Sequence, residues 1–317
     1  MNTRKIQEVG GGTFTVSLPR EWARAQSVCQ GETVDVFTHL DGTLVIQTHH
    51  RETDSTGSVS IPIREEGAER VKQVLLAAYT AGYTDITLDP CRSFTQPQRA
   101  AAREAAQTLV GASIATDSEQ CIEVRVLVDS EEISVRQLVR QLSFVARSMH
   151  REAIAALGED EAAPRLGDRD DQADRLYAIT DRSFSRALSR LDEVDSLGYT
   201  RPELFELWST ARDLERIADH AERIGGIANS FDGSVPQDHL TGIQELADST
   251  QTVIERAVNC VVNDSDLGRG YEALTLRSQI RDQVSTLDER LFADSAADYR
   301  LARVLDRPAT ATRWKHR

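Results

Sequence analysis

The chain has 317 residues, with 51 acidic and 37 basic side chains and a formal net charge of −14. This length predicts two or three domains of roughly 150 residues, and the hydrophobic fraction of 40% excludes a disordered chain. No apolar run approaches the roughly 18 residues of a membrane span, and residues 1–25 lack a signal-peptide core. We therefore expect a soluble, cytoplasmic protein with no membrane insertion.

The basic residues are almost all arginines. Only three of the 37 bases are lysines, which leaves 34 arginines, and the acids outnumber both together. We interpret this composition as adaptation to a salty cytoplasm, where acidic surfaces stay hydrated and dissolved salt screens their repulsion. Acidic pairs are then common, so spacing alone does not identify a carboxylate site.

Residues 1–47 predict a small β unit. A short strand, TFTVSL, is followed by Pro19 and one or two helical turns, and two further strands meet at Asp41-Gly42, a hairpin signal. About 45 residues are too few to bury a core, so this unit should pair with a second copy.

The first 24 residues of this unit carry four bases and two acids, a net +2, whereas the other 293 residues of the chain carry −16. A basic patch on an acidic protein is typical of a nucleic-acid contact, although solvated bases on a hairpin are the alternative.

The segments of this unit that carry a resemblance are TRKIQEVGGGTFTVSLPREWARAQSV, GETVDVF and DGTLVI. Together they resemble the AbrB/SpoVT family of swapped-hairpin DNA-binding domains. The resemblance implies a dimer of interleaved strands that contacts DNA through bases near the entry strand and the short helix. The bases in those regions are Arg4, Lys5, Arg20 and Arg24. Many members have further arginines where this chain has Thr15 and Ala23, so a purely dimerising role is the alternative.

A polar, turn-rich linker is expected at residues 48–57 and a small α/β domain at 58–129. In the latter, SVSIPI, DITLD and IEVRVLVD are typical of strands. Residues 67–82 and 96–110 have helical spacing.

From about Val135 the apolar residues recur at intervals of three and four, which predicts helices. Expected breaks between helices are Gly158–Gly167, Gly198–Pro202 and Gly225–Pro236. Three more helical segments are expected near 238–262, 270–292 and 295–306. Six helices in two sets of three predict a bundle built from a tandem repeat, with repeats at 130–232 and 235–312.

Two acidic pairs on neighbouring helices of the first repeat are spaced i, i+4, so each pair lies on one helix face. They are Asp170 with Asp174 and Glu215 with Asp219. Such oxygen ligands suit Mg²⁺, Mn²⁺ or iron. However, 51 acids in 317 positions give about eight such pairs by chance, and Arg212 and Arg216 could neutralise the second pair.

Helical phase places both pairs roughly 100° to 160° away from the apolar stripes. We therefore expect a solvent-reachable site on the outer face of the bundle. A sealed di-iron centre is not expected, because Glu-x-x-His pairs are missing and His220 points elsewhere.

Residues 130–310 resemble the PhoU family of phosphate-uptake regulators, most closely at RDDQADRLY and DLERIADHAERI. In that family, acid-x-x-x-Asp pairs on two helices of each three-helix repeat bind clustered metal ions. The resemblance thus implies that Asp170, Asp174, Glu215 and Asp219 are metal ligands.

The second repeat matches the first incompletely. Its apolar alignment sets Ser278 opposite Asp170 and Asp282 opposite Asp174, while Ala302 replaces Glu215 and Asp306 keeps the place of Asp219. Each pair has lost one carboxylate. We predict one competent metal site, in the first repeat, and a degenerate remnant in the second.

Together these segments predict a multidomain α+β protein: a swapped-hairpin β domain, a small α/β domain and a six-helix bundle. This order resembles archaeal phosphate-uptake regulators along nearly the whole chain, and the composition fits a halophilic archaeon. The first hypothesis is a homodimeric DNA-binding regulator of phosphate uptake. The alternative is an accessory protein that binds a phosphate ABC transporter or a regulatory kinase and uses the hairpin only to dimerise. An enzyme is not expected, because no base and nucleophile are arranged for catalysis.

Overall fold

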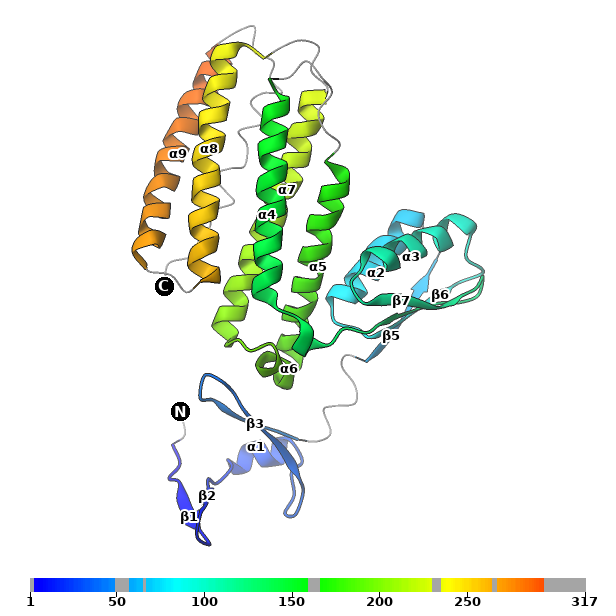
Figure 1. Ribbon diagram of the computed structural model, residues 1–317. Helices are drawn as coiled ribbons and strands as arrows, with labels where there is room; N and C mark the ends of the chain where they lie inside the picture. Colours follow the sequence, from blue (N-terminus) through cyan, green and yellow to red (C-terminus); the bar gives the residue numbers. More distant parts are fainter. Residues whose placement is uncertain are drawn as a thin grey trace. The chain divides into compact units, whose positions relative to one another are not determined.

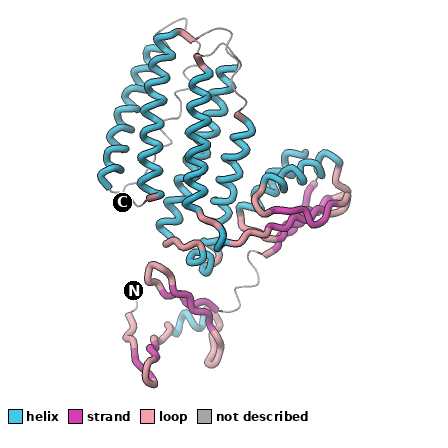
Figure 2. The backbone as a smooth tube through the Cα atoms, viewed as in Figure 1, coloured by secondary structure: helices cyan, strands magenta, loops and turns pink. Residues whose placement is uncertain are grey.

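The computed structural model describes residues 3–48, 57–64, 67–158, 166–229, 235–263 and 267–293. The chain divides into two compact units, Met1–Ser55 and Thr56–Arg317. Strands occur in both units and long helices in the second, which confirms the mixed α+β class (Figure 2). Most of the expected linker and the whole expected helix at 295–306 lie outside the described residues.

The first unit consists of two β-hairpins and a short helix (Figure 1). Its elements are β1 (Gln7–Val9), β2 (Thr13–Thr15), α1 (Arg20–Ala25), β3 (Val34–Thr38) and β4 (Leu44–Thr48). Strands β1 and β2 pair antiparallel across Gly10–Gly12, three glycines with positive φ, and the β3–β4 turn contains Gly42 at φ 78°. Both turns require backbone conformations that glycine adopts without strain.

This unit has almost no core of its own. Among residues 3–48, His39 is the only buried residue. Large apolar side chains are exposed instead, including Ile6 at 70%, Phe14 at 71% and Leu40 at 63%. This much exposed apolar surface on so small a unit agrees with the expectation that it needs a partner.

The second unit begins with a four-stranded sheet of order β5-β6-β8-β7. Its elements are β5 (Ser58–Ile63), α2 (Ala68–Thr80), β6 (Asp85–Pro90), α3 (Gln96–Thr108), β7 (Ala112–Asp117) and β8 (Ile122–Val126). The inward side chains of the strands pack with α2 and α3 into one core, which includes Leu75, Tyr79 and Leu88. The expected strands and both helices are confirmed.

Strand β7 was not predicted. Its sequence, ASIATD, contains mostly small and polar residues, so its composition gives little strand signal. It forms because it pairs antiparallel with β8, with an irregularity between Ile114 and Thr116. Tertiary pairing therefore determines this strand.

The helical part follows. Its described helices are α4 (Val135–Ala156), α5 (Gly167–Ser189), α6 (Leu191–Ser196), α7 (Arg201–Asn229), α8 (Gln237–Val262) and α9 (Leu267–Ala293). Helix α4 lies between α5, α7 and α8, and α9 packs on α8 (Figure 1). One hydrophobic core runs through all of them, with Leu142, Met149, Leu207 and Ile224 among its most buried side chains. No described helix is both long and apolar enough to cross a membrane.

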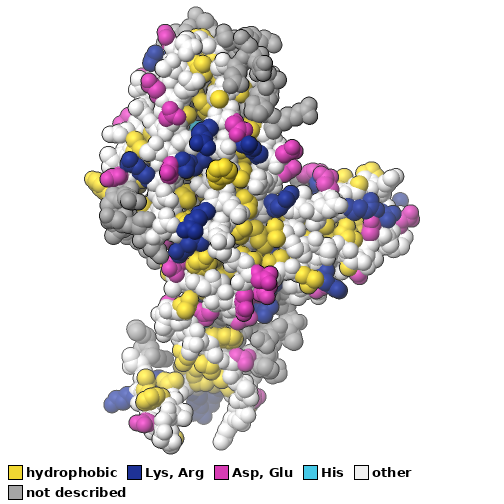
Figure 3. Space-filling model, viewed as in Figure 1, with side chains coloured by type: hydrophobic (Ala, Val, Ile, Leu, Met, Phe, Trp, Pro, Cys, Tyr) yellow, Lys and Arg dark blue, Asp and Glu magenta, His cyan; other side chains and the backbone are white. Residues whose placement is uncertain are grey.

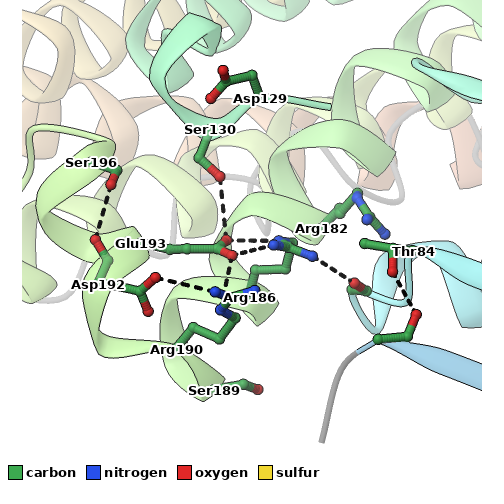
Figure 4. A network of polar contacts seen from close by, with 12 residues as sticks. Thr84, Asp129, Ser130, Arg182, Arg186, Ser189, Arg190, Asp192, Glu193 and Ser196 are labelled. Atoms are coloured by element: carbon green, nitrogen blue, oxygen red, sulfur yellow. Dashed lines mark hydrogen bonds and ion pairs between the residues drawn. The ribbon is translucent and has the colours of Figure 1, made fainter. Parts of the chain in front are cut away.

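Two expected helix boundaries differ from the structure. The periodicity predicts one helix through Val194, but Arg190 is extended (φ −123°, ψ 111°) and separates α5 from α6. The turn brings the buried carboxylate of Glu193 back to the guanidinium groups of Arg186 and Arg190 (Figure 4). In addition, α7 continues past Gly225 to Asn229, so the expected break begins later than predicted; a Cβ at Gly225 would lie 3.1 Å from the Leu166 side chain, so glycine allows close packing here.

Helix α5 also joins the bundle to the sheet domain. The fully buried Arg182 donates hydrogen bonds to the carbonyls of Tyr79 (2.7 Å) and Tyr83 (2.9 Å) and lies over the Tyr79 ring at 4.9 Å. One helical turn further on, Arg186 donates to the carbonyl of Gly82 (3.0 Å; Figure 4). These contacts cap the C-terminal end of α2 from another domain.

Candidate functional sites

The predicted metal ligands lie on α5 and α7, two helices that pack against each other. Ligand oxygens of Asp170, Asp174 and Asp219 all lie within 4.8 Å of one another. Glu215 is outside this trio but close enough for its carboxyl group to respond to the charges of Asp219 and Asp174. The structure thus brings the four predicted residues into one region, three of them at ligand spacing.

Burial and mutual repulsion disfavour the ionised forms of these carboxyl groups. Burial raises the pKa of Asp170 to about 7, and the charge of Asp174 adds to the rise. The same two effects raise the pKa of Asp174 to about 6, with Asp219 as the main neighbour, and that of Glu215 to about 7. One carboxylate oxygen of Asp170, Oδ1, is buried and has no hydrogen-bond partner among the described residues. A bound cation would reduce the repulsion between the carboxylates and would give Asp170 Oδ1 the partner that it lacks.

The neighbouring arginines compensate this cluster only weakly. Arg216 forms an ion pair with Asp213 at 3.8 Å, although its charge also lowers the pKa of Glu215. Arg212 lies over the ring of Trp208 at 5.8 Å. Within the cluster itself, Asp219 forms a long ion pair with Arg223, at 3.7 Å.

The cluster is more buried than helical phase indicated. Asp174 is exposed and Glu215 and Asp219 are half-buried, as expected for residues that flank an apolar stripe. Asp170, however, has its Oδ1 atom fully covered. His220 is buried in the core and takes no part in the trio.

A fifth acid beside the cluster was missed. Glu222 is exposed, and its charge raises the pKa values of Asp170 and Asp174. Its position three residues after Asp219 on α7 was the available signal. In the second repeat, Ser278 and Asp282 lie exposed on α9, while positions 302 and 306 fall outside the described residues. The degenerate second site remains a prediction.

The predicted DNA-binding residues all lie in the first unit. Arg4 and Lys5 precede β1, and Arg20 and Arg24 lie at the two ends of α1. All four are exposed, and none forms an ion pair with a described carboxylate. Their charges are therefore available to a ligand.

The helices that carry the carboxylate cluster have a recognisable family pattern. Residues 139–228 match the PhoU domain. This match covers most of α4 and all of α5, α6 and α7 before the last residue, and it contains the four carboxylates. The PhoU domain suggests a regulator of phosphate homeostasis. Neither a curated protein nor a solved structure matches the chain.

Proposed function

We propose that this protein is a homodimeric, DNA-binding transcription regulator of phosphate uptake whose PhoU domain binds metal ions. The PhoU domain at residues 139–228 supports the link to phosphate. The observation that carries the finer proposal is the charge of the two units: exposed, uncompensated bases in the first and a concentrated carboxylate cluster in the second.

The carboxylate cluster fits a cation. Asp170, Asp174 and Asp219 would hold it, with Glu215 beside them. Their oxygen donors suit a hard divalent ion or iron, and the raised pKa values and the unpartnered Oδ1 of Asp170 indicate that the cluster is under-neutralised as it stands. A bound ion would supply the missing positive charge and fix α5 against α7.

The first unit fits a dimer that contacts DNA. Its exposed apolar side chains need a partner surface, and a second copy provides one with the same composition. Four bases per chain become eight in a dimer, enough for several phosphate contacts. Because the cytoplasm is expected to be salty, phosphate contacts alone would bind DNA weakly, so contacts to base edges or recognition of DNA shape must add to the affinity.

Chromatin immunoprecipitation with sequencing tests the proposal, in phosphate-replete and phosphate-starved cells. We expect enrichment at phosphate-transporter promoters that changes with phosphate. The decisive variant is R4A/K5A/R20A/R24A, which should lose promoter binding and still dimerise by light scattering. The matched control, R64A/R70A/R175A/R201A, removes four exposed arginines of the second unit and should bind normally.

The same experiment separates the alternative function. If the wild-type protein shows no enrichment in either state, the hairpins serve only dimerisation, and the protein is an accessory factor of a phosphate transporter or a regulatory kinase. The specific observation in favour of that alternative is the presence of Thr15 and Ala23 where further arginines would strengthen DNA binding.

A further inference from the structure

The open face of α4 carries four arginines around an exposed aromatic ring. This α4 stripe consists of Arg136, Arg140, Phe144, Arg147 and Arg151. At 100° per residue the five side chains fall within an arc of about 80°, and at 1.5 Å per residue they extend along roughly 22 Å of the helix. Arg140, Phe144 and Arg151 are exposed, whereas Arg136, which lies over the Tyr199 ring, and Arg147 are half-buried. The five side chains therefore form one surface along α4.

The charges of the stripe are only partly compensated. Arg140 donates to an amide oxygen of Asn263 (2.7 Å), a contact that orients the guanidinium without neutralising it. Arg147 donates to the amide of Gln251 (3.0 Å) and forms an ion pair with the half-exposed Glu255. Arg151 is exposed and has no partner among the described residues. Contacts from α8 thus preorganise a surface that remains positive.

The aromatic ring is the apolar part of this surface. Phe144 is 70% exposed and lies one turn from both Arg140 and Arg147. A single exposed apolar side chain needs no explanation by itself. Here the ring lies in the middle of a row of positive charge on a chain of net charge −14. Figure 3 shows basic and hydrophobic side chains together over the middle of this face.

We propose that the α4 stripe docks an amphipathic acidic helix of a partner protein. Such a helix laid along α4 would oppose acidic side chains to Arg140, Arg147 and Arg151, whose spacings of seven and four residues repeat along one helix face. Its apolar residues would cover Phe144. This is recognition of a helix by a helical surface, with charge setting the register and the ring supplying the buried contact.

The surrounding charges favour a short acidic segment over a nucleic acid. Carboxylates interrupt the edge of the stripe at Glu152, which pairs with Arg169, and at Glu255. A long polyanion would also meet the repulsion of the carboxylate cluster and of the net −16 that lies outside the first 24 residues. A helix about as long as the stripe lies over its arginines and meets less of this negative charge. The inference does not depend on metal binding or on DNA binding.

Site-specific photocrosslinking in cells tests it with the full chain. Phe144 is replaced by p-benzoylphenylalanine, and the crosslinked peptides are sequenced by mass spectrometry. The control position is Tyr271, an equally exposed aromatic residue on α9. A second variant combines the photocrosslinker at position 144 with the charge reversals R140E/R151E. Its control combines the crosslinker with R175E/R201E, which reverses two exposed arginines elsewhere.

The expected result is a crosslink from position 144, above that from position 271, to an acidic amphipathic segment of another protein. Its yield should fall on the order of tenfold in R140E/R151E and not in R175E/R201E, because like charges would then face each other. R140Q/R151Q replaces the reversal if that variant fails to fold, and should weaken the crosslink in the same direction. A crosslink to this chain itself, to nucleic acid or to a non-acidic segment, or none above the control, would overturn the proposal.

Discussion

The carboxylate cluster makes a prediction whose sign depends on the presence of a cation. Asp174→Asn removes one of the charges that crowd the α5–α7 seam. The rise in the pKa of Asp174 from 3.8 to about 6 corresponds to about 3 kcal/mol at roughly 1.4 kcal/mol per pH unit. Because this side chain is exposed, solvent screening reduces the expected gain from its removal to about 1 kcal/mol. In chelator at pH 8, the variant should therefore be more stable than the wild type, by roughly 2–4 °C in Tm.

With a bound cation the order should reverse. An ion present at 100 times its Kd stabilises the wild type by about 2.7 kcal/mol, which exceeds the gain of about 1 kcal/mol in the variant. The measurement is differential scanning calorimetry of both proteins in chelator and with Mg²⁺, Mn²⁺ or Fe²⁺, together with metal content by mass spectrometry. Asp248→Asn, which removes an exposed acid from α8, is the control and should respond to neither condition. If Asp174→Asn lowers Tm in chelator, or if no cation separates it from the wild type, the cluster is a structural feature and the reasoning fails.

Three further predictions follow from the second unit. In chelator, stability should fall as pH rises from about 4 to about 7. The pKa of Asp170 is about 7 in the folded protein and 3.8 in the unfolded chain, so over that interval the folded state holds a proton that the unfolded chain has lost. Denaturant midpoints across this range check it, and a rising midpoint contradicts it. Arg182→Ala removes two charge-assisted hydrogen bonds, which together contribute about 3 kcal/mol. Amide hydrogen exchange at the end of α2, measured by mass spectrometry, should therefore become faster on the order of 100-fold. The control variant Arg175→Ala should leave this exchange rate unchanged. In Gly82→Ala the new Cβ would sit on a residue with φ +100° and lie 2.7 Å from the Arg186 side chain. The substitution should lower the free energy of unfolding by roughly 1–3 kcal/mol, and with it the Tm. An unchanged Tm would show that the Arg186 side chain moves aside without cost.

Periodicity predicted the long helices well because each buries a continuous apolar stripe. The helix at α7, for example, follows from Leu204, Leu207, Ala211 and Leu214, all of which are buried. Strand β7 could not be predicted, since its stability comes from β8 and not from its own residues. The break at Arg190 was not predicted either, because periodicity does not show the ion pair that Glu193 forms with Arg186, seven residues earlier.

The candidate metal site was only partly visible in the sequence. Spacing paired Asp170 with Asp174 on one helix and Glu215 with Asp219 on another, but it gave no distance between α5 and α7, which depends on packing. Helical phase also placed all four acids at the surface. It could not show that Asp170 Oδ1 would be covered, because helical phase does not describe what packs against the helix.

The arginines near the end of α5 have a structural role that their spacing does not indicate. Arg182, Arg186 and Arg190 follow one another at four-residue intervals, a pattern that is typical of a solvated face. In the structure Arg182 is 2% exposed, and it bonds to carbonyl groups of a helix that lies about 100 residues earlier in the chain. Only the fold reveals that Arg182 and Arg186 join α5 to the sheet domain.

The distribution of charge constrains how the proposed activities can coexist in one chain. Carboxylates that attract a cation repel DNA, and arginines that attract DNA repel a cation, so each activity weakens the other if the two share a surface. Here the bases Arg4, Lys5, Arg20 and Arg24 belong to one compact unit and the carboxylate cluster to the other. A cation at the cluster would reduce the negative charge of the second unit and with it the repulsion of DNA from the whole protein. Metal loading should therefore strengthen DNA binding at low ionic strength and lose this effect at about 1 M salt, where the Debye length is near 3 Å; an effect of metal that persists in high salt would require a direct structural connection instead.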